Sequence, residues 1–179
     1  MTASPGHAPR WDAIVGAPGF ALGIVTTDAA VLSIEFLPER IAETARNPNP
    51  NPIAAEAVRQ LTAYLLDPHF CFDLPLASAG SAHQQAVWQV LNGIAPGHTL
   101  TYGDVARRVG SSARAVGAAC GANPLPVIVP CHRVTAAGGA LGGFAHSTEG
   151  FLPGIKRWLL NHEAACTAFT LTPPGSVLS

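Results

Sequence analysis

The chain has 179 residues and a formal net charge of −1, with 48% apolar and 12% charged residues. This composition is typical of a globular chain with a buried core, and it excludes an intrinsically disordered protein. No apolar run reaches the length of a membrane span. The first residues, Met1 to Gly6, also lack the basic-then-apolar order of a secretory signal. We therefore expect a cytoplasmic protein that makes no membrane contact.

Charge is divided unevenly along the chain. Residues 1–80 sum to −4, whereas residues 81–166 sum to +3. A mildly basic second half suits a partner with negative charge, such as a phosphate backbone, although patches of this size are common on other proteins.

Cysteine and histidine spacing argues against a metal site. The four cysteines lie far apart and form no C-x-x-C pair, which disfavours both a zinc knuckle and a disulfide framework. Three histidines also lack a cysteine or carboxylate partner at ligand spacing: His69, His83 and His98. We expect no metal and no other cofactor.

The first half predicts a small α/β arrangement. Residues 20–25 and 31–36 are expected to be paired strands around the turn at Thr27-Asp28. The alternating Asn and Pro of residues 47–52 form a loop, and Pro52 then opens a helix over 53–66. Residues 70–74 predict a further strand. The small residues 77–80 mark a domain boundary.

The second half is richer in helix signals. Capping boxes start helices at Ser81 and at Thr101, and the second of these helices stops at Gly110. The stripe of the first helix is Ala86, Val87, Val90, Leu91 and Ile94. Ser112 caps a third helix over 113–121, so that the last two helices have helix-turn-helix spacing.

Four further segments complete the expected order. A strand over 127–129 leads into Cys131, and a glycine-rich hairpin follows over 138–143. A last helix spans about 153–164, and residues 171–179 form a loose tail.

The segment Val127 to Val134 contains the strongest chemical signal. Its Cys131 is flanked by Pro130, His132 and Arg133. Cationic and hydrogen-bonding neighbours lower the pKa of a thiol, and the thiolate is the nucleophile. Cys131 is therefore predicted to be an activated nucleophile, against the alternative of a small buried apolar residue.

Several motifs now resemble one family, the O6-alkylguanine-DNA alkyltransferases. The match covers about residues 81–165, with the motifs in order. They are Arg114-Ala115-Val116-Gly117, Asn123-Pro124, Pro130-Cys131-His132-Arg133-Val134, Trp158-Leu159-Leu160 and His162-Glu163.

The resemblance implies a fold and an activity. The fold would be an α/β ribonuclease-H-like domain over 1–77 and a mostly α domain over 81–166. The latter would carry a winged helix-turn-helix-like DNA-binding unit, and residues 167–179 would be a tail. The activity would be direct-reversal DNA repair, in which Cys131 takes an alkyl group from guanine O6, with thymine O4 left open, once per protein molecule. The protein would be a monomer that binds alkylated double-stranded DNA from the minor-groove side, with the guanine flipped out.

The resemblance also implies roles for individual residues. His132 and Glu163 would activate Cys131, through a bridging water because neighbours on a strand point to opposite faces. Asn123 would tie the recognition helix to the active-site strand. Arg114 would fill the space that the flipped base leaves, and Tyr102 would contact the flipped nucleotide.

Two sets complete the predicted site. The DNA-binding set is Arg114, Tyr102, Thr101, Ala115, Gly117 and Ala118. The base-pocket set is Pro126, Val134, Phe144, Ala145 and His146. The small residues of the recognition helix would allow close approach to DNA, but they would equally suit tight packing against another helix. They therefore give only weak evidence for DNA binding.

Some residues depart from the family pattern. The loop 145–154 is longer than usual, and His146 stands where a glycine would line the alkyl pocket, which leaves the accepted alkyl size open. Two other functions also stay open. A Cys-His hydrolase would need an oxyanion hole and an orienting group, and a non-catalytic alkylated-DNA-binding protein would not need Cys131.

Overall fold

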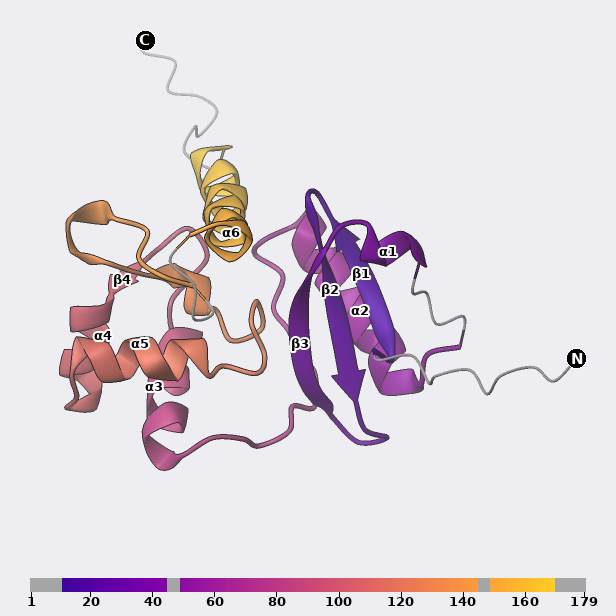
Figure 1. Ribbon diagram of the computed structural model, residues 1–179, viewed down its shortest axis with the longest axis horizontal. Helices are drawn as coiled ribbons and strands as arrows, with labels where there is room; N and C mark the ends of the chain where they lie inside the picture. The colour runs from indigo at the N-terminus through magenta and orange to yellow at the C-terminus, as the bar shows by residue number, and fades with distance from the viewer. Residues whose placement is uncertain (1–10, 45–48, 145–148, 170–179) are drawn as a thin grey trace, which may run out of the picture. The chain divides into compact units, whose positions relative to one another are not determined.

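The computed structural model describes residues 11–44, 49–144 and 149–169. The chain divides into two compact units: residues 1–65 with 71–78, and residues 66–70 with 79–179. Its secondary structure is mixed α/β, with one three-stranded antiparallel sheet and several helices (Figure 1). Within the described residues, no helix is both long enough and apolar enough to cross a membrane.

The first unit is built on the three-stranded antiparallel sheet. Its strands are β1 (Ala13–Ala17), β2 (Phe20–Thr26) and β3 (Val31–Pro38), paired in the order β1-β2-β3. The β2–β3 pair was predicted, but β1 was missed because its sequence, AIVGA, is a short run in which only Ile14 and Val15 favour a strand. Pro18 and Gly19 join β1 to β2, and Gly19 has a φ of 84°, which only glycine adopts without strain.

Two helices complete this unit, α1 (Ile41–Thr44) and α2 (Pro52–Leu66). Asn51 caps α2 by accepting from the Ala54 N–H, and its Nδ2 donates to Thr26 Oγ1 at the end of β2. The buried face of α2 supplies Ala57, Leu61 and Tyr64 to the core. The predicted start at Pro52 agrees with the structure.

The predicted strand over residues 70–74 is wrong. Residues 71–75 have no strand conformation, and only an isolated parallel bridge joins Leu76 to Val31. The segment instead bonds to α2, where Gln60 donates to the Asp73 carbonyl and accepts from the Asp73 N–H, at 2.7 and 2.8 Å. A side chain that satisfies both backbone groups of Asp73 replaces the ladder that a strand would need.

The second unit packs three helices against one another: α3 (Ala82–Asn92), α4 (Tyr102–Val109) and α5 (Ala113–Gly121) (Figure 1). The predicted caps at Ser81, Thr101 and Ser112 all hydrogen-bond their helices. The predicted buried face of α3 was partly wrong, because Trp88 is buried while Ala86 is exposed. The Trp88 indole N–H donates to the Ala119 carbonyl of α5 at 2.9 Å.

The segments around Cys131 are more irregular than predicted. A one-turn helix η1 (Cys131–Arg133) precedes β5 (Val134–Thr135), which pairs in parallel with β4 (Leu100–Thr101). The predicted glycine-rich hairpin is a turn, η2 (Ala137–Gly139), closed by a bond from the Ala136 N–H to the Ala140 carbonyl. Consecutive glycines have too few side chains to hold two paired strands.

Helix α6 (Phe151–Phe169) begins before and ends after the predicted helix 153–164. The predicted tail over 171–179 lies outside the described residues. The β4–β5 pair places the start of α4 beside the segment that follows Cys131, which brings the predicted site residues of the second unit together.

Candidate active site

Cys131 does not follow a strand, as the sequence predicted, but sits at the start of η1 after a tight turn. The Val129 N–H donates to the Leu125 carbonyl and the Cys131 N–H to the Val129 carbonyl, both at 2.8 Å. Prolines at 124, 126 and 130 remove the donors that a strand ladder needs. Val127 has a φ of 75°, a strained value for a β-branched residue. The opposite-face argument for Cys131 and His132 therefore does not apply.

Asn123 connects α5 to this turn. Its backbone N–H donates to the Cys120 carbonyl at 3.3 Å, near the end of the helix. Its side chain donates to the Val129 carbonyl at 2.9 Å and accepts from the Leu125 N–H at 3.0 Å. Its side chain also lowers the pKa of the Cys131 thiol, against the larger raising effect of burial. Asn123 thus links the end of α5 to the turn that precedes Cys131.

His132, Arg133 and Glu163 form a buried charged network. His132 Nε2 lies 2.6 Å from Glu163 Oε1, and both side chains have no exposed surface. Arg133 donates to the same carboxylate from Nε and Nη2, at 3.0 and 2.9 Å. Arg133 Nη1 donates to the Ile94 carbonyl at 2.5 Å, and the Gly97 N–H donates to Glu163 Oε2 at 3.3 Å.

The network determines the protonation of His132. Burial alone would raise the pKa of Glu163, but hydrogen bonds from His132 and Arg133 outweigh it and hold that pKa well below its usual range. Burial lowers the pKa of His132, which its bond to Glu163 offsets only in part. The ionised carboxylate accepts a hydrogen bond from His132 Nε2–H, so Nδ1 is the acceptor nitrogen. Nδ1 makes no hydrogen bond within the described part of the chain.

Burial works against ionisation of the Cys131 thiol, whereas its neighbours in the sequence predicted a lowered pKa. Burial raises its pKa, and the Asn123 hydrogen bond and the Lys156 charge lower it only in part. Arg133, which the sequence suggested as an activating cation, is paired with Glu163 instead. The thiol therefore keeps its proton at neutral pH until a base removes it.

Lys156 of α6 is a site residue that sequence reasoning missed. Its side chain is fully buried, and Nζ donates to the Val134 carbonyl at 2.6 Å and to the Gly143 carbonyl at 3.1 Å. Burial lowers its pKa to about 8, against the raising effect of Cys131 and Cys120. A signal was present, because the chain's single lysine falls at i, i+3, i+7 spacing with Leu159 and Glu163, the buried face of α6.

Tyr102, at the start of α4, contacts Lys156. Its hydroxyl donates to the Gly143 carbonyl at 3.1 Å and lies 3.5 Å from Lys156 Nζ. Burial, with smaller effects from Cys120 and Cys131, raises its pKa to about 12, so the phenol stays a neutral donor. Thr101 caps α4 by accepting from the Asp104 N–H.

The base-pocket set is only partly within the described residues. Pro126, Val134 and Phe144 are buried, and the Phe144 ring centroid lies 5.9 Å from Lys156 Nζ. Ala145 and His146 lie outside the described residues, so the departure at His146 stays a prediction.

Helix α5 presents its small residues and Arg114 at the surface. Arg114 and Ala118 are exposed, and Ala115 and Gly117 are partly exposed. A Cβ added to Gly117 would meet no atom within 4 Å. Tight packing among the described residues therefore does not require a glycine at 117, whereas Ala119 of the same helix is buried and packs next to Trp88 of α3.

These contacts define a class: a cysteine that follows a turn held by an asparagine, next in sequence to a histidine that a buried carboxylate orients. Comparisons with known proteins narrow the class. A family model described as "6-O-methylguanine DNA methyltransferase, DNA binding domain" matches residues 82–165.

Curated relatives extend the match. A methylated-DNA–protein-cysteine methyltransferase of Mycobacterium tuberculosis is 41% identical over 152 residues, which cover 84% of this chain and 87% of the relative. The constitutive methylated-DNA–protein-cysteine methyltransferase of Bacillus subtilis is 44% identical over 128 residues, 70% of this chain and 73% of the relative.

A solved structure agrees with these relatives. The crystal structure of M. tuberculosis OGT in complex with DNA has a TM-score of 0.67 and 34% identity, and the match covers 85% of this chain and 91% of that one. The chain therefore belongs to the methylated-DNA–protein-cysteine methyltransferase family.

Proposed function

We propose that the protein repairs alkylated DNA directly, by moving an alkyl group from guanine O6 to Cys131 Sγ in a single turnover. The observation that best supports this proposal is the arrangement of Cys131, Asn123, His132 and Glu163 in a chain of this family. The M. tuberculosis relative bound to DNA supports double-stranded DNA as the partner.

The reaction needs a base for the thiol. His132 Nδ1 receives the Cys131 proton, through a bridging water, and Glu163 stabilises the imidazolium that forms. Arg133 and the Gly97 N–H keep Glu163 ionised and fixed while this happens. The thiolate forms only as the proton leaves, beside Asn123 and the Lys156 ammonium.

Alkyl transfer then breaks the bond between guanine O6 and the alkyl carbon and forms the S–C bond. The electron pair of the broken bond stays with guanine, which accepts a hydrogen bond or a proton as it leaves. Tyr102 is suited to donate, because its raised pKa keeps the hydroxyl protonated. The product is a thioether, which is a poor leaving group at neutral pH, so the protein is consumed.

The finer fold description also belongs to this proposal. We expect a ribonuclease-H-like domain over residues 1–77 and a winged helix-turn-helix-like unit within 81–166, with α5 as the recognition helix. The capped pair α4 and α5, joined by Gly110 in a left-handed conformation, supports the second assignment. A cytoplasmic, monomeric protein remains the expectation.

Replacing Cys131 with alanine tests the assignment. The variant should transfer no alkyl group from a duplex that contains O6-methylguanine, yet bind that duplex within about twofold of the wild-type affinity, because the thiol contributes little to the interface. Intact mass and a gel-shift titration measure the two properties. The Cys120→Ala variant is the control that keeps transfer.

The outcomes separate the alternatives. Continued repair by Cys131→Ala would refute the assignment. Release of more than one equivalent of product by the wild type would indicate a Cys-His hydrolase, and binding without any gain in mass would indicate a non-catalytic alkylated-DNA-binding protein.

Arg114→Ala should slow transfer from duplex DNA but not from the free alkylated base. Flipping a base out of the stack costs a few kcal/mol, and a side chain that fills the gap returns part of it, so we expect a loss of about 10- to 100-fold on duplex only. Single-turnover rates on both substrates measure the effect. The exposed Arg59→Ala, in the first unit, is the control. Equal losses on both substrates would contradict a role for Arg114 in flipping.

A further inference from the structure

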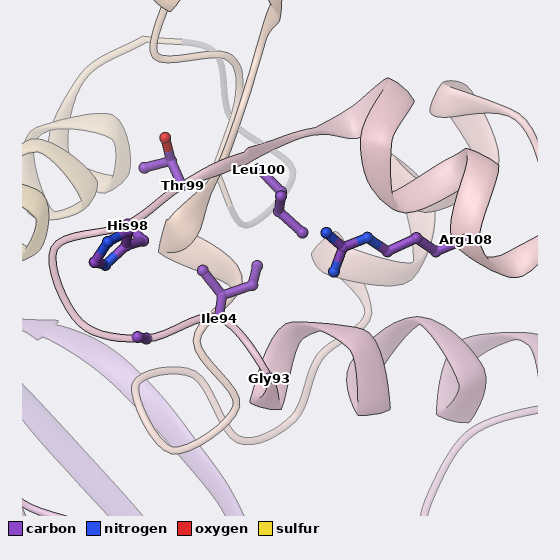
Figure 2. Close-up of a pocket in the computed structure, with 7 residues that line it drawn as sticks. Gly93, Ile94, His98, Thr99, Leu100 and Arg108 are labelled. Atoms are coloured by element: carbon purple, nitrogen blue, oxygen red, sulfur yellow. The ribbon is translucent and has the colours of Figure 1, made fainter.

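A pocket lies beside the buried network rather than at the thiol. It is an open pocket of about 300 Å³, lined by the loop between α3 and β4, by Leu100 of β4 and by one side chain of α4. Its lining residues are Gly93, Ile94, Ala95, His98, Thr99, Leu100 and Arg108. In Figure 2 the Arg108 side chain extends toward Leu100 and Ile94, whereas His98 lies at the far end of the loop. None of the pocket residues is among those proposed for alkyl transfer.

The lining combines polar and apolar surface with the guanidinium of Arg108. Ile94 and Leu100 contribute hydrocarbon surface, and Arg108 contributes a guanidinium. The neighbouring Arg107 is paired with Asp104, but no hydrogen bond or ion pair from Arg108 occurs among the described residues. A guanidinium binds phosphate or carboxylate oxygens through two parallel N–H donors. A few polar groups over an apolar surface are typical of small-ligand sites.

The loop that lines the pocket is also bonded to the catalytic network. Ile94 is held through its carbonyl by Arg133 Nη1, at 2.5 Å, and Gly97 donates its N–H to Glu163 Oε2, at 3.3 Å. Arg133 and the Gly97 N–H both hold the carboxylate that orients His132. A ligand that orders this loop therefore acts on the position of Glu163 without touching the thiol.

We propose that this pocket binds a phosphate monoester with a small apolar group, and that its occupancy strengthens the contacts of loop 93–99 with Glu163. Arg108 binds the phosphate oxygens, and Ile94 and Leu100 cover the apolar group. The effect on alkyl transfer rests on the proposed function, whereas binding itself does not.

Calorimetric titration tests the binding, with phenyl phosphate, inorganic phosphate and phenol as separate probes. Phenyl phosphate should bind about tenfold or more tightly than either of the other two, because only it uses both parts of the pocket. Arg108→Ala should weaken that binding about tenfold or more, the usual size of a lost charge-assisted hydrogen bond. The control Arg107→Ala removes an exposed guanidinium of the same helix that does not line the pocket, and it should change the binding less than about twofold.

Two results would contradict the proposed binding site. One is an equal loss of affinity for phenyl phosphate in the Arg107→Ala and Arg108→Ala variants, and the other is binding of phenyl phosphate no tighter than that of inorganic phosphate. The natural ligand could be the phosphorylated end of a DNA strand or a free small phosphate ester. Binding of a 5′-phosphorylated oligonucleotide, compared with binding of the same strand without the phosphate, distinguishes these two sources of the phosphate group.

The coupling is measured separately. Saturating phenyl phosphate should raise the rate of transfer from a free alkylated guanine to Cys131 by about fivefold in the wild type and not in Arg108→Ala. Thermal unfolding of the wild type should shift upward with the probe, because a ligand that binds the native state stabilises it. If phenyl phosphate binds but the transfer rate does not change, the proposed coupling is wrong and the proposed binding site still stands. Absent transfer at any probe concentration, with binding intact, would instead count against the proposed function.

Discussion

Glu163→Gln is expected to destabilise the protein by about 3–5 kcal/mol and to slow alkyl transfer by about 10²- to 10⁴-fold. The amide keeps the size of the carboxyl group but leaves Arg133 as a buried cation without its counter-charge. It also removes the anion that stabilises the protonated His132. Both losses arise at one carboxylate, so stability and rate should fall together.

The pH dependence of stability has a definite sign. The pKa of Glu163 is lowered in the folded protein, so the folded state binds fewer protons than the unfolded state at acid pH. Its stabilising contribution is fully present above the unfolded pKa of about 4.3 and is lost as the pH falls toward the folded value. The Glu163→Gln variant should lack this part of the acid destabilisation.

Denaturant titrations between about pH 3 and 7 measure this effect, and transfer rates are compared at a temperature where both proteins are folded. Glu149→Gln makes the same chemical change at an exposed position and should stay within about 0.5 kcal/mol of wild type. A wild-type transfer rate in Glu163→Gln would show that Glu163 has no part in the reaction.

Lys156→Met is expected to slow transfer about 10- to 100-fold at neutral pH and to change the shape of its pH profile. The ammonium lowers the pKa of Cys131 and holds the Val134 and Gly143 carbonyls. Methionine is an unbranched side chain one atom shorter than lysine, and it supplies neither a charge nor hydrogen-bond donors.

The sign again follows from the pKa. That of Lys156 is lowered to about 8, so the cation is present below this pH and lost above it. Thiol ionisation favours transfer as the pH rises, and loss of the ammonium opposes it. The wild-type rate should therefore pass through a maximum on the alkaline side of the Lys156 pKa of about 8, between it and the raised pKa of Cys131, whereas the rate of Lys156→Met should continue to rise. Stopped-flow or quench measurements on both sides of that maximum would record the two profiles.

A charge-keeping variant separates electrostatics from packing. Lys156→Arg retains a cation that does not titrate in this range, so it should remove the fall in rate on the alkaline side if the larger side chain is accommodated. Identical profiles for wild type and Lys156→Met would contradict a role for the Lys156 charge.

Local signals in the sequence predicted the helices well. Ser81, Thr101 and Ser112 each cap a helix through a bond to a residue three positions away, so a short pattern contains the whole interaction. The β2–β3 pair was likewise evident from two apolar runs around a short turn.

Features that depend on distant partners were not predictable in this way. The segment around Asp73 is held by Gln60, 13 residues earlier, rather than by a strand. The motif Cys131-His132-Arg133 drew attention to the right place, but it could not reveal that Arg133 neutralises Glu163 or that Lys156 is the cation that lowers the thiol pKa. Arg133 and Glu163 are 30 residues apart in the sequence, and Lys156 comes near Cys131 only through the packing of α6.

Single-turnover transfer is tested most directly by the mass of the intact protein after incubation with an excess of duplex that contains O6-methylguanine. We predict a gain of one methylene unit per molecule that reaches a plateau at one equivalent, and peptide mapping should place it on Cys131 with Cys120 unmodified. An unchanged mass, a modification at another residue, or product that accumulates beyond one equivalent would contradict the assignment of Cys131 as the alkyl acceptor.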